Sequence, residues 1–337
     1  MSEFCPPVNA RVWRLGRCSM LYSPRALVVC AILAALIVLS AALAMVIGKM
    51  DIRLGQVLAA LSGKGEGGLT EHIILNIRLP RMLAALFVGL ALGVSGAVFQ
   101  SVSRNALGSP DIIGFTTGAA TGALAQIILF GMGATEVALA AVAGGILTAT
   151  VVYVLARQDG VVGSYRLILT GIGVGAVLSA LNGLMLVRGN LDNAVMANLW
   201  LTGSLHARTW GHVLPVMAGV CLLLPLVCLG AAALGMIEMG DDIANQLGIR
   251  VEKVRAGMIF CAVVLAALAT GAAGPIAFVA LAAPQLSGRL CRATGLPVFS
   301  AGLMGGFLLL AADLLTQSLP LAVSNPNGRK YRRGGGF

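Results

Sequence analysis

Two arginines separated by a Leu-Pro pair have the chemistry to recognise carboxylates. Arg78 and Arg81 stand immediately before a long charge-free segment, and Pro80 fixes the backbone between them. Because guanidinium groups form paired hydrogen bonds with carboxylates, we expect both side chains to point outward from this segment, where an acidic partner can reach them. Snorkelling to lipid headgroups is an equally good interpretation of this pattern alone.

A polar interval between two apolar runs has the pattern of a docking surface. It reads MIEMGDDIANQLGIRVEKVR from Met236 to Arg255. Asp241 is expected to cap a short helix, and Gly248 to end that helix in the left-handed conformation. Exposed charges alternating with apolar side chains suit insertion into a groove of a partner protein. An ordinary loop between two membrane spans is the alternative.

Few other residues have side chains that could carry out chemistry. Asp313 lies inside an apolar run and Glu136 near the end of another, where a carboxylate can be functional. We expect Glu136 in the outer headgroup region. We interpret Asp313 as a structural hydrogen-bonding group, since no second carboxylate suggests proton coupling. Lys64, in SGKGEGG, lacks the GxxxxGK[ST] spacing of a phosphate-binding loop, so any ATP-driven work needs another chain. The seven cysteines have no metal-ligand spacing. We expect no catalytic residue, metal or cofactor.

Composition sets the class of protein in which these groups lie. Hydrophobic residues make up 58% of the chain and charged residues 11%, with a mean hydropathy of +0.93. Soluble domains carry about 25% charged residues, so this chain is a membrane protein. The net charge of +10 does not indicate nucleic-acid binding, because the basic residues lie between apolar runs and form no basic face with aromatic residues.

Apolar runs predict an all-α protein with nine helices in the membrane. The first run, Ala26 to Gly48, is too long for the apolar part of a signal peptide. Gly274-Pro275 breaks the run that ends near Leu286, which predicts a short returning helix after the break. In the second span, glycines allow another helix to approach closely; they are Gly89, Gly93 and Gly96. The remaining spans are expected at about 82–100, 112–131, 134–156, 167–187, 213–234, 256–273 and 298–319.

The basic residues orient the chain and divide it into three parts. Four arginines before the first span place residues 1–25 in the cytoplasm, followed by a transmembrane domain over 26–319. Nine crossings leave the basic tail, residues 320–337, outside, against the positive-inside rule. This tail is polar and glycine-rich, so we expect it to be disordered. We interpret the ending as a truncated or frame-shifted terminus that lacks a tenth helix.

Four motifs give the chain a family resemblance. They are RLPR at 78–81, SGAVFQ at 95–100, RNALGSPDIIGF at 104–115 and GPIAFVALAAPQ at 274–285. The chain resembles the iron-siderophore and vitamin B12 ABC importer permeases from about residue 26 to about residue 318. It departs from them at Gln285, where the family often has His, at Gln317, where an Arg is frequent, and after Leu319-Pro320, where the family's final helix is missing.

The resemblance implies a ten-helix permease fold in the bacterial inner (cytoplasmic) membrane and a set of partners. These are a second permease subunit in a homo- or heterodimer, two ATP-binding cassette subunits, and a periplasmic or lipid-anchored substrate-binding protein. The implied cargo is a ferric siderophore, of the catecholate type such as enterobactin. A corrinoid or haem importer, a secondary transporter or channel, and a non-functional truncated chain are the alternatives.

The resemblance also assigns roles to residues. It implies that Arg78 and Arg81 dock acidic residues of the binding protein. It implies a cytoplasmic gate at Ser164 and Tyr165, in the turn Gly163-Ser164-Tyr165-Arg166. It places the contact that couples the permease to the ATPase at Gly240, Asp241, Leu247, Gly248 and Arg250.

Overall fold

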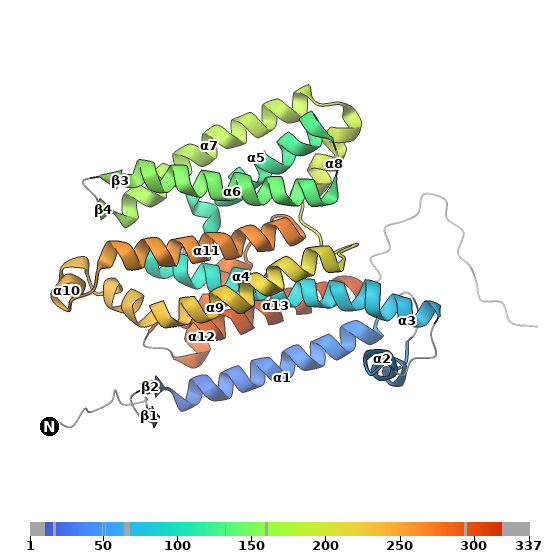
Figure 1. Cartoon of the computed structure of the whole chain (residues 1–337), viewed down its shortest axis with the longest axis horizontal. Helices are drawn as coiled ribbons and strands as arrows, with labels where there is room; N and C mark the ends of the chain where they lie inside the picture. Colours follow the sequence, from blue (N-terminus) through green and yellow to red (C-terminus); the bar gives the residue numbers. More distant parts are fainter. Residues whose placement is uncertain are drawn as a thin grey trace, which may run out of the picture.

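The computed structural model describes residues 11–15, 18–48, 50, 52–63, 68–131, 133–158, 161–292 and 295–318. Within these residues the chain is nearly all helical (Figure 1), as predicted. Two short antiparallel hairpins were not predicted: β1 (Arg11–Leu15) with β2 (Cys18–Tyr22), and β3 (Arg157–Gln158) with β4 (Val161–Val162). The predicted tail, 320–337, lies outside the described residues.

Seven helices of the described chain are long and apolar enough to cross a membrane. Two shorter helices occur among them: the apolar α5 (Phe115–Ala125), extended by η3 (Gln126–Phe130), and the 13-residue α12 (Val279–Cys291). Helices therefore occupy all nine predicted positions, although two of them are too short to count as full spans. The seven long helices are α1 (Pro24–Val46), α4 (Leu79–Ser103), α6 (Ala134–Ala156), α7 (Ser164–Arg188), α9 (Trp210–Glu238), α11 (Val251–Ala273) and α13 (Val298–Ser318).

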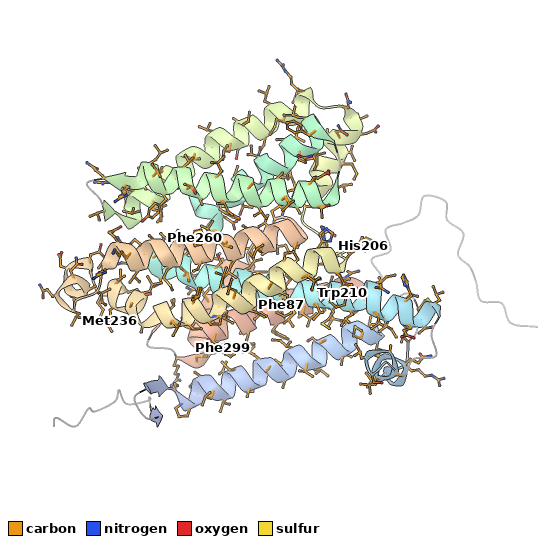
Figure 2. All side chains as sticks on the ribbon, in the orientation of Figure 1. Phe87, His206, Trp210, Met236, Phe260 and Phe299 are labelled. Atoms are coloured by element: carbon orange, nitrogen blue, oxygen red, sulfur yellow. The ribbon has the colours of Figure 1, made fainter. Side chains whose placement is uncertain are left out.

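Short helices connect the long ones and mark the two ends of the bundle. Figure 1 shows the β1–β2 hairpin, the β3–β4 hairpin and α10 (Asp241–Gln246) at one end, with α2, α3 and α8 at the other. Figure 2 places Met236 at the first end, and His206 and Trp210 at the second. Because the positive-inside rule predicts a cytoplasmic N-terminus, we call the first the cytoplasmic end and the second the external end. The bounds of the other short elements are α2 Leu54–Leu61, α3 Leu69–Ile73, η1 Ile74–Arg78, η2 Pro110–Ile113 and α8 Leu191–Leu201.

Helix α4 lies at the centre of the fold because its glycines admit neighbouring backbones. A Cβ added to Gly89 would lie 2.3 Å from the carbonyl oxygen of Gly305 in α13. A Cβ on Gly96 would lie 1.8 Å from the carbonyl oxygen of Ala280 in α12. No side chain fits at these separations. The structure therefore confirms the predicted close approach, and it identifies α12 and α13 as the helices that approach.

The predicted break after α11 is present. Gly274 has a φ of +76° and Phe278 one of +68°, so the chain turns sharply before α12 returns towards the cytoplasmic end. The turn packs against the segment after α8, where the amide of Ser204 donates to the carbonyl of Ala273 at 2.8 Å. A broken helix is tolerated at membrane depth only where neighbours satisfy its backbone, as they do here.

Candidate external and cytoplasmic sites

Arg78 binds the end of α1 instead of pointing outward. Its guanidinium donates hydrogen bonds to the carbonyls of Met45, Val46 and Met50 at 2.6–2.8 Å. The last carbonyls of a helix lack partners within the helix and carry its negative dipole end, so a cation is stabilising there. The predicted outward orientation is therefore wrong for Arg78, because α1 ends within reach of its side chain.

Arg81 forms an ion pair with Asp313 near the external end of the bundle. Nε lies 3.1–3.2 Å from the two carboxylate oxygens and Nη2 lies 2.8 Å from Oδ1. Gln317, one turn further along α13, donates to the same carboxylate at 2.7 Å. Asp313 thus forms structural hydrogen bonds, as predicted, whereas Arg81 faces a carboxylate of its own chain. Docking of the binding protein at Arg78 and Arg81 stays a prediction.

A cavity of about 680 Å³ opens beside this ion pair. Sequence reasoning missed most of its wall, because the wall comes from segments that are distant along the chain. The signals that were available are the Gly-Pro break and Asp111 within the RNALGSPDIIGF motif. The wall consists of Arg81, Asp111, Thr116, Thr117, residues 201–206, residues 275–277, Leu309, Ala312, Asp313 and Thr316.

At the cytoplasmic end, the polar interval forms the short helix α10. Gly248, with a φ of +80°, ends this segment in the left-handed conformation, as predicted. The amide of Gly248 donates to the carbonyl of Asn245, and that of Ile249 to the carbonyl of Ala244. Asp241 is not the cap, which is a correction: Gly240, with a φ of +133°, stands at the cap position and Asp241 is the first helical residue.

Asp241 joins three elements through two arginines. Arg255 of α11 donates from Nη2 to both carboxylate oxygens at 2.8 Å, and Arg104, just after α4, forms a second ion pair with Oδ1. Arg104 also donates to the carbonyl of Ile237 near the end of α9 at 2.7 Å. Partial desolvation acts to raise the pKa of Asp241, but the hydrogen bonds and charges of Arg255 and Arg104 outweigh it and lower the pKa below its usual value. The start of α10 is therefore fixed to the ends of α4, α9 and α11.

The outer face of this interval is exposed and apolar. Leu247 is 62% exposed and Met239 69% exposed, and Ile243 is about half exposed. A cavity of about 500 Å³ borders the same interval, with Arg250 and Asp242 in its wall. An apolar helix face held on a rigid base, with charged residues around it, has the properties of a docking surface.

The two residues assigned to the gate lie at the same end of the bundle. Ser164 is the first residue of α7, and Tyr165 follows it with 76% of its side chain exposed. Figure 1 shows the β3–β4 hairpin, which leads into α7, at the cytoplasmic end together with α10. Their role as a gate stays a prediction.

Comparison with known proteins identifies this arrangement. Residues 27–328 match the model of the FecCD transport family. The chain belongs to this family. It is 43% identical over 310 residues to the ferric enterobactin transport system permease protein FepG of Escherichia coli, covering 92% of this chain and 93% of that one. It is 37% identical to the achromobactin transport system permease protein CbrC of Dickeya dadantii, covering 94% and 91% of the two chains.

Two more distant matches extend the comparison. The cobalamin import system permease protein BtuC of Halobacterium salinarum is 33% identical, over 74% of this chain and 67% of that one. A solved structure of an inward-facing putative metal-chelate type ABC transporter superposes with a TM-score of 0.76 at 26% identity, covering 86% and 90% of the two chains. The chain is therefore a multi-pass membrane transport subunit with an ABC permease fold.

Proposed function

We propose that the chain is the permease subunit of an ABC importer in the bacterial inner membrane, and that it carries a ferric siderophore of the enterobactin type into the cytoplasm. The observation that supports the cargo most strongly is the 43% identity to a ferric enterobactin permease over nearly the whole of both chains. The relation to cobalamin permeases is weaker and covers less of the chain.

Each end of the bundle has a surface or cavity that suits a different partner. A substrate-binding protein delivers the siderophore at the external end, where the cavity beside Arg81 and Asp313 receives it. One of the two ATPase subunits binds at the cytoplasmic end of this chain, at the surface formed by Gly240, Asp241, Leu247, Gly248 and Arg250, and the other binds the second permease subunit. A second permease subunit completes the path.

Transport requires that the path be open to only one end of the bundle at a time, and the ATPases drive the switch between the two ends. Asp241, Arg104 and Arg255 fix residues 240–250, here called the coupling segment, to the ends of three long helices, so a force on α10 is transmitted to those helices. Close-packed helices shift between discrete arrangements rather than deform smoothly. We infer that ATPase closure opens the path at one end of the bundle and closes it at the other.

A growth experiment tests the proposed cargo. The gene is expressed with its own ATPase, second permease and binding protein in cells that have an outer-membrane receptor for ferric enterobactin but no permease for it. Growth with ferric enterobactin as the only iron source is expected. Growth that depends on a different siderophore, or cobalamin uptake in its place, would show that the cargo is wrong although the transporter class is right.

A further inference from the structure

Two side chains of α11 bind the β3–β4 hairpin, and neither was given an individual role from the sequence. Arg255 donates from Nη1 to the carbonyl of Val162 in β4 at 2.9 Å. The amide of Val162 in turn donates to Oε2 of Glu252 at 3.3 Å. Glu252 and Arg255 also pair with each other at 2.5 Å. Both backbone polar groups of a single hairpin residue are therefore held by one turn of α11.

The same guanidinium holds the coupling segment. Arg255 uses Nη1 for the hairpin and Nη2 for Asp241 at the start of α10. Only 2% of the Arg255 side chain is exposed, whereas the side chains of Asp241 and Glu252 are 35% and 32% exposed. Charge-assisted hydrogen bonds of this kind are stronger than neutral ones. A single buried cation thus connects α10 to β4.

The hairpin leads directly into α7. Val162 is itself 1% exposed, and only Gly163 separates it from Ser164, the first residue of that helix. No flexible segment therefore intervenes between the bonded backbone of Val162 and the cytoplasmic end of α7. A displacement of the hairpin is passed to the turn that carries Ser164 and Tyr165.

We propose that Glu252 and Arg255 form a clamp that transmits movement of the coupling segment to the β3–β4 hairpin and to the cytoplasmic end of α7. The two residues are positioning residues, since they act through the hairpin and touch no substrate. The proposal rests on the proposed function, because it requires the ATPase to dock at α10. It goes beyond that function by naming the connection between docking and the opening of the path.

The test measures transport per ATP in the complete importer, reconstituted in lipid vesicles. Glu252→Ala removes the acceptor for the amide of Val162 and one partner of Arg255, while Arg255 keeps Asp241. We expect ATP hydrolysis stimulated by the binding protein to persist, and import of ferric enterobactin per ATP to fall at least about tenfold, as expected for the loss of two charge-assisted hydrogen bonds. Glu252→Gln retains an oxygen acceptor and is expected to recover part of the loss. Arg289→Ala removes an exposed charge near the end of α12, outside the docking interval, and is the matched control, with no change expected.

Hydrogen exchange in the same complexes provides a second measurement that does not depend on import. In the parent importer, a non-hydrolysable ATP analogue should change exchange in peptides that cover the coupling segment and in peptides that cover Val162. In Glu252→Ala, peptides that cover the coupling segment should still respond, whereas peptides that cover Val162 should not. Three results for Glu252→Ala would overturn the clamp. They are an unchanged ratio of import to ATP hydrolysis, a proportional loss of both, and a hairpin response that persists. A parent importer that neither moves ferric enterobactin nor hydrolyses ATP would overturn the proposed function itself.

Discussion

Removing one member of the Arg81–Asp313 pair should destabilise the permease more than removing both. The carboxylate of Asp313 is 5% exposed and accepts from Nε and Nη2 of Arg81. Breaking a buried ion pair from one side costs about 3–5 kcal/mol, whereas polar contacts between membrane helices average about 0.6 kcal/mol. Because 24% of the Arg81 side chain is exposed, we expect a coupling energy between these limits, about 1–2 kcal/mol.

A double-mutant cycle measures this energy. The free energy of unfolding is determined by denaturant titration in mixed micelles for Arg81→Gln, Asp313→Asn, the double variant and the parent. Glu136→Gln, at an exposed carboxylate in the first turn of α6, is the control and should change the free energy of unfolding by less than about 0.5 kcal/mol. If the two substitutions are additive within about 0.5 kcal/mol, the ion pair does not stabilise the fold and the reasoning is refuted.

The same variants test docking of the binding protein. Asp313→Asn frees Arg81 to meet an acidic partner, whereas Arg81→Gln removes the cation. If Arg81 docks the binding protein, only Arg81→Gln weakens the affinity measured at low salt, by about tenfold for one close charge pair. An equal loss in both variants would show that the arginine acts through the fold alone.

Three further predictions concern packing, coupling and pH. Gly96→Ala forces α4 and α12 apart and should lower stability by about 1–3 kcal/mol, while Gly257→Ala, with open space around it, should not lower it; equal thermal unfolding midpoints for the two variants would contradict the packing argument. Gly248→Val places a β-branched residue at a φ of +80° and should reduce binding-protein-stimulated ATP hydrolysis, whereas Gly248→Asn should retain most of it; full activity of the valine variant would rule out the coupling role. Since the pKa of Asp241 is lowered in the folded protein, the stability that it provides should be constant above about pH 5 and decline progressively below about pH 4, as the pH falls through the lowered pKa. Thermal unfolding against pH checks this, and a decline that is identical in Asp241→Asn would show that other carboxylates cause it.

The features that follow from local sequence were predictable. Long apolar runs give the helix positions, because a helix in lipid must satisfy its own backbone hydrogen bonds. Gly274-Pro275 marks the break after α11, and the close packing at Gly89 and Gly96 follows from the absence of a side chain. Gly248 was placed correctly because few other residues adopt the left-handed conformation at the end of a helix.

The features that depend on distant contacts were not predictable. Arg81 and Asp313 are 232 residues apart in the sequence, so the RLPR motif alone gives no sign that its second arginine is already paired. Arg78 was misread for the same reason, since its partners are backbone carbonyls at the end of α1. Strands β3 and β4 contain two residues each, which is too short for an alternating pattern. The partners of Arg255 become visible only when β4, α10 and α11 are brought together.

The central claim is that this chain forms the membrane path of an ABC importer for a ferric siderophore of the enterobactin type. The most direct measurement is the accumulation of ferric enterobactin labelled with radioactive iron in lipid vesicles that contain the complete importer, with labelled cobalamin in a parallel sample. The account predicts that ferric enterobactin accumulates in the vesicle lumen. This accumulation requires ATP in the lumen, which the ATPase subunits face, and the binding protein outside the vesicle. Cobalamin should not accumulate. Accumulation that proceeds without ATP, or that is driven by a proton gradient alone, would contradict it.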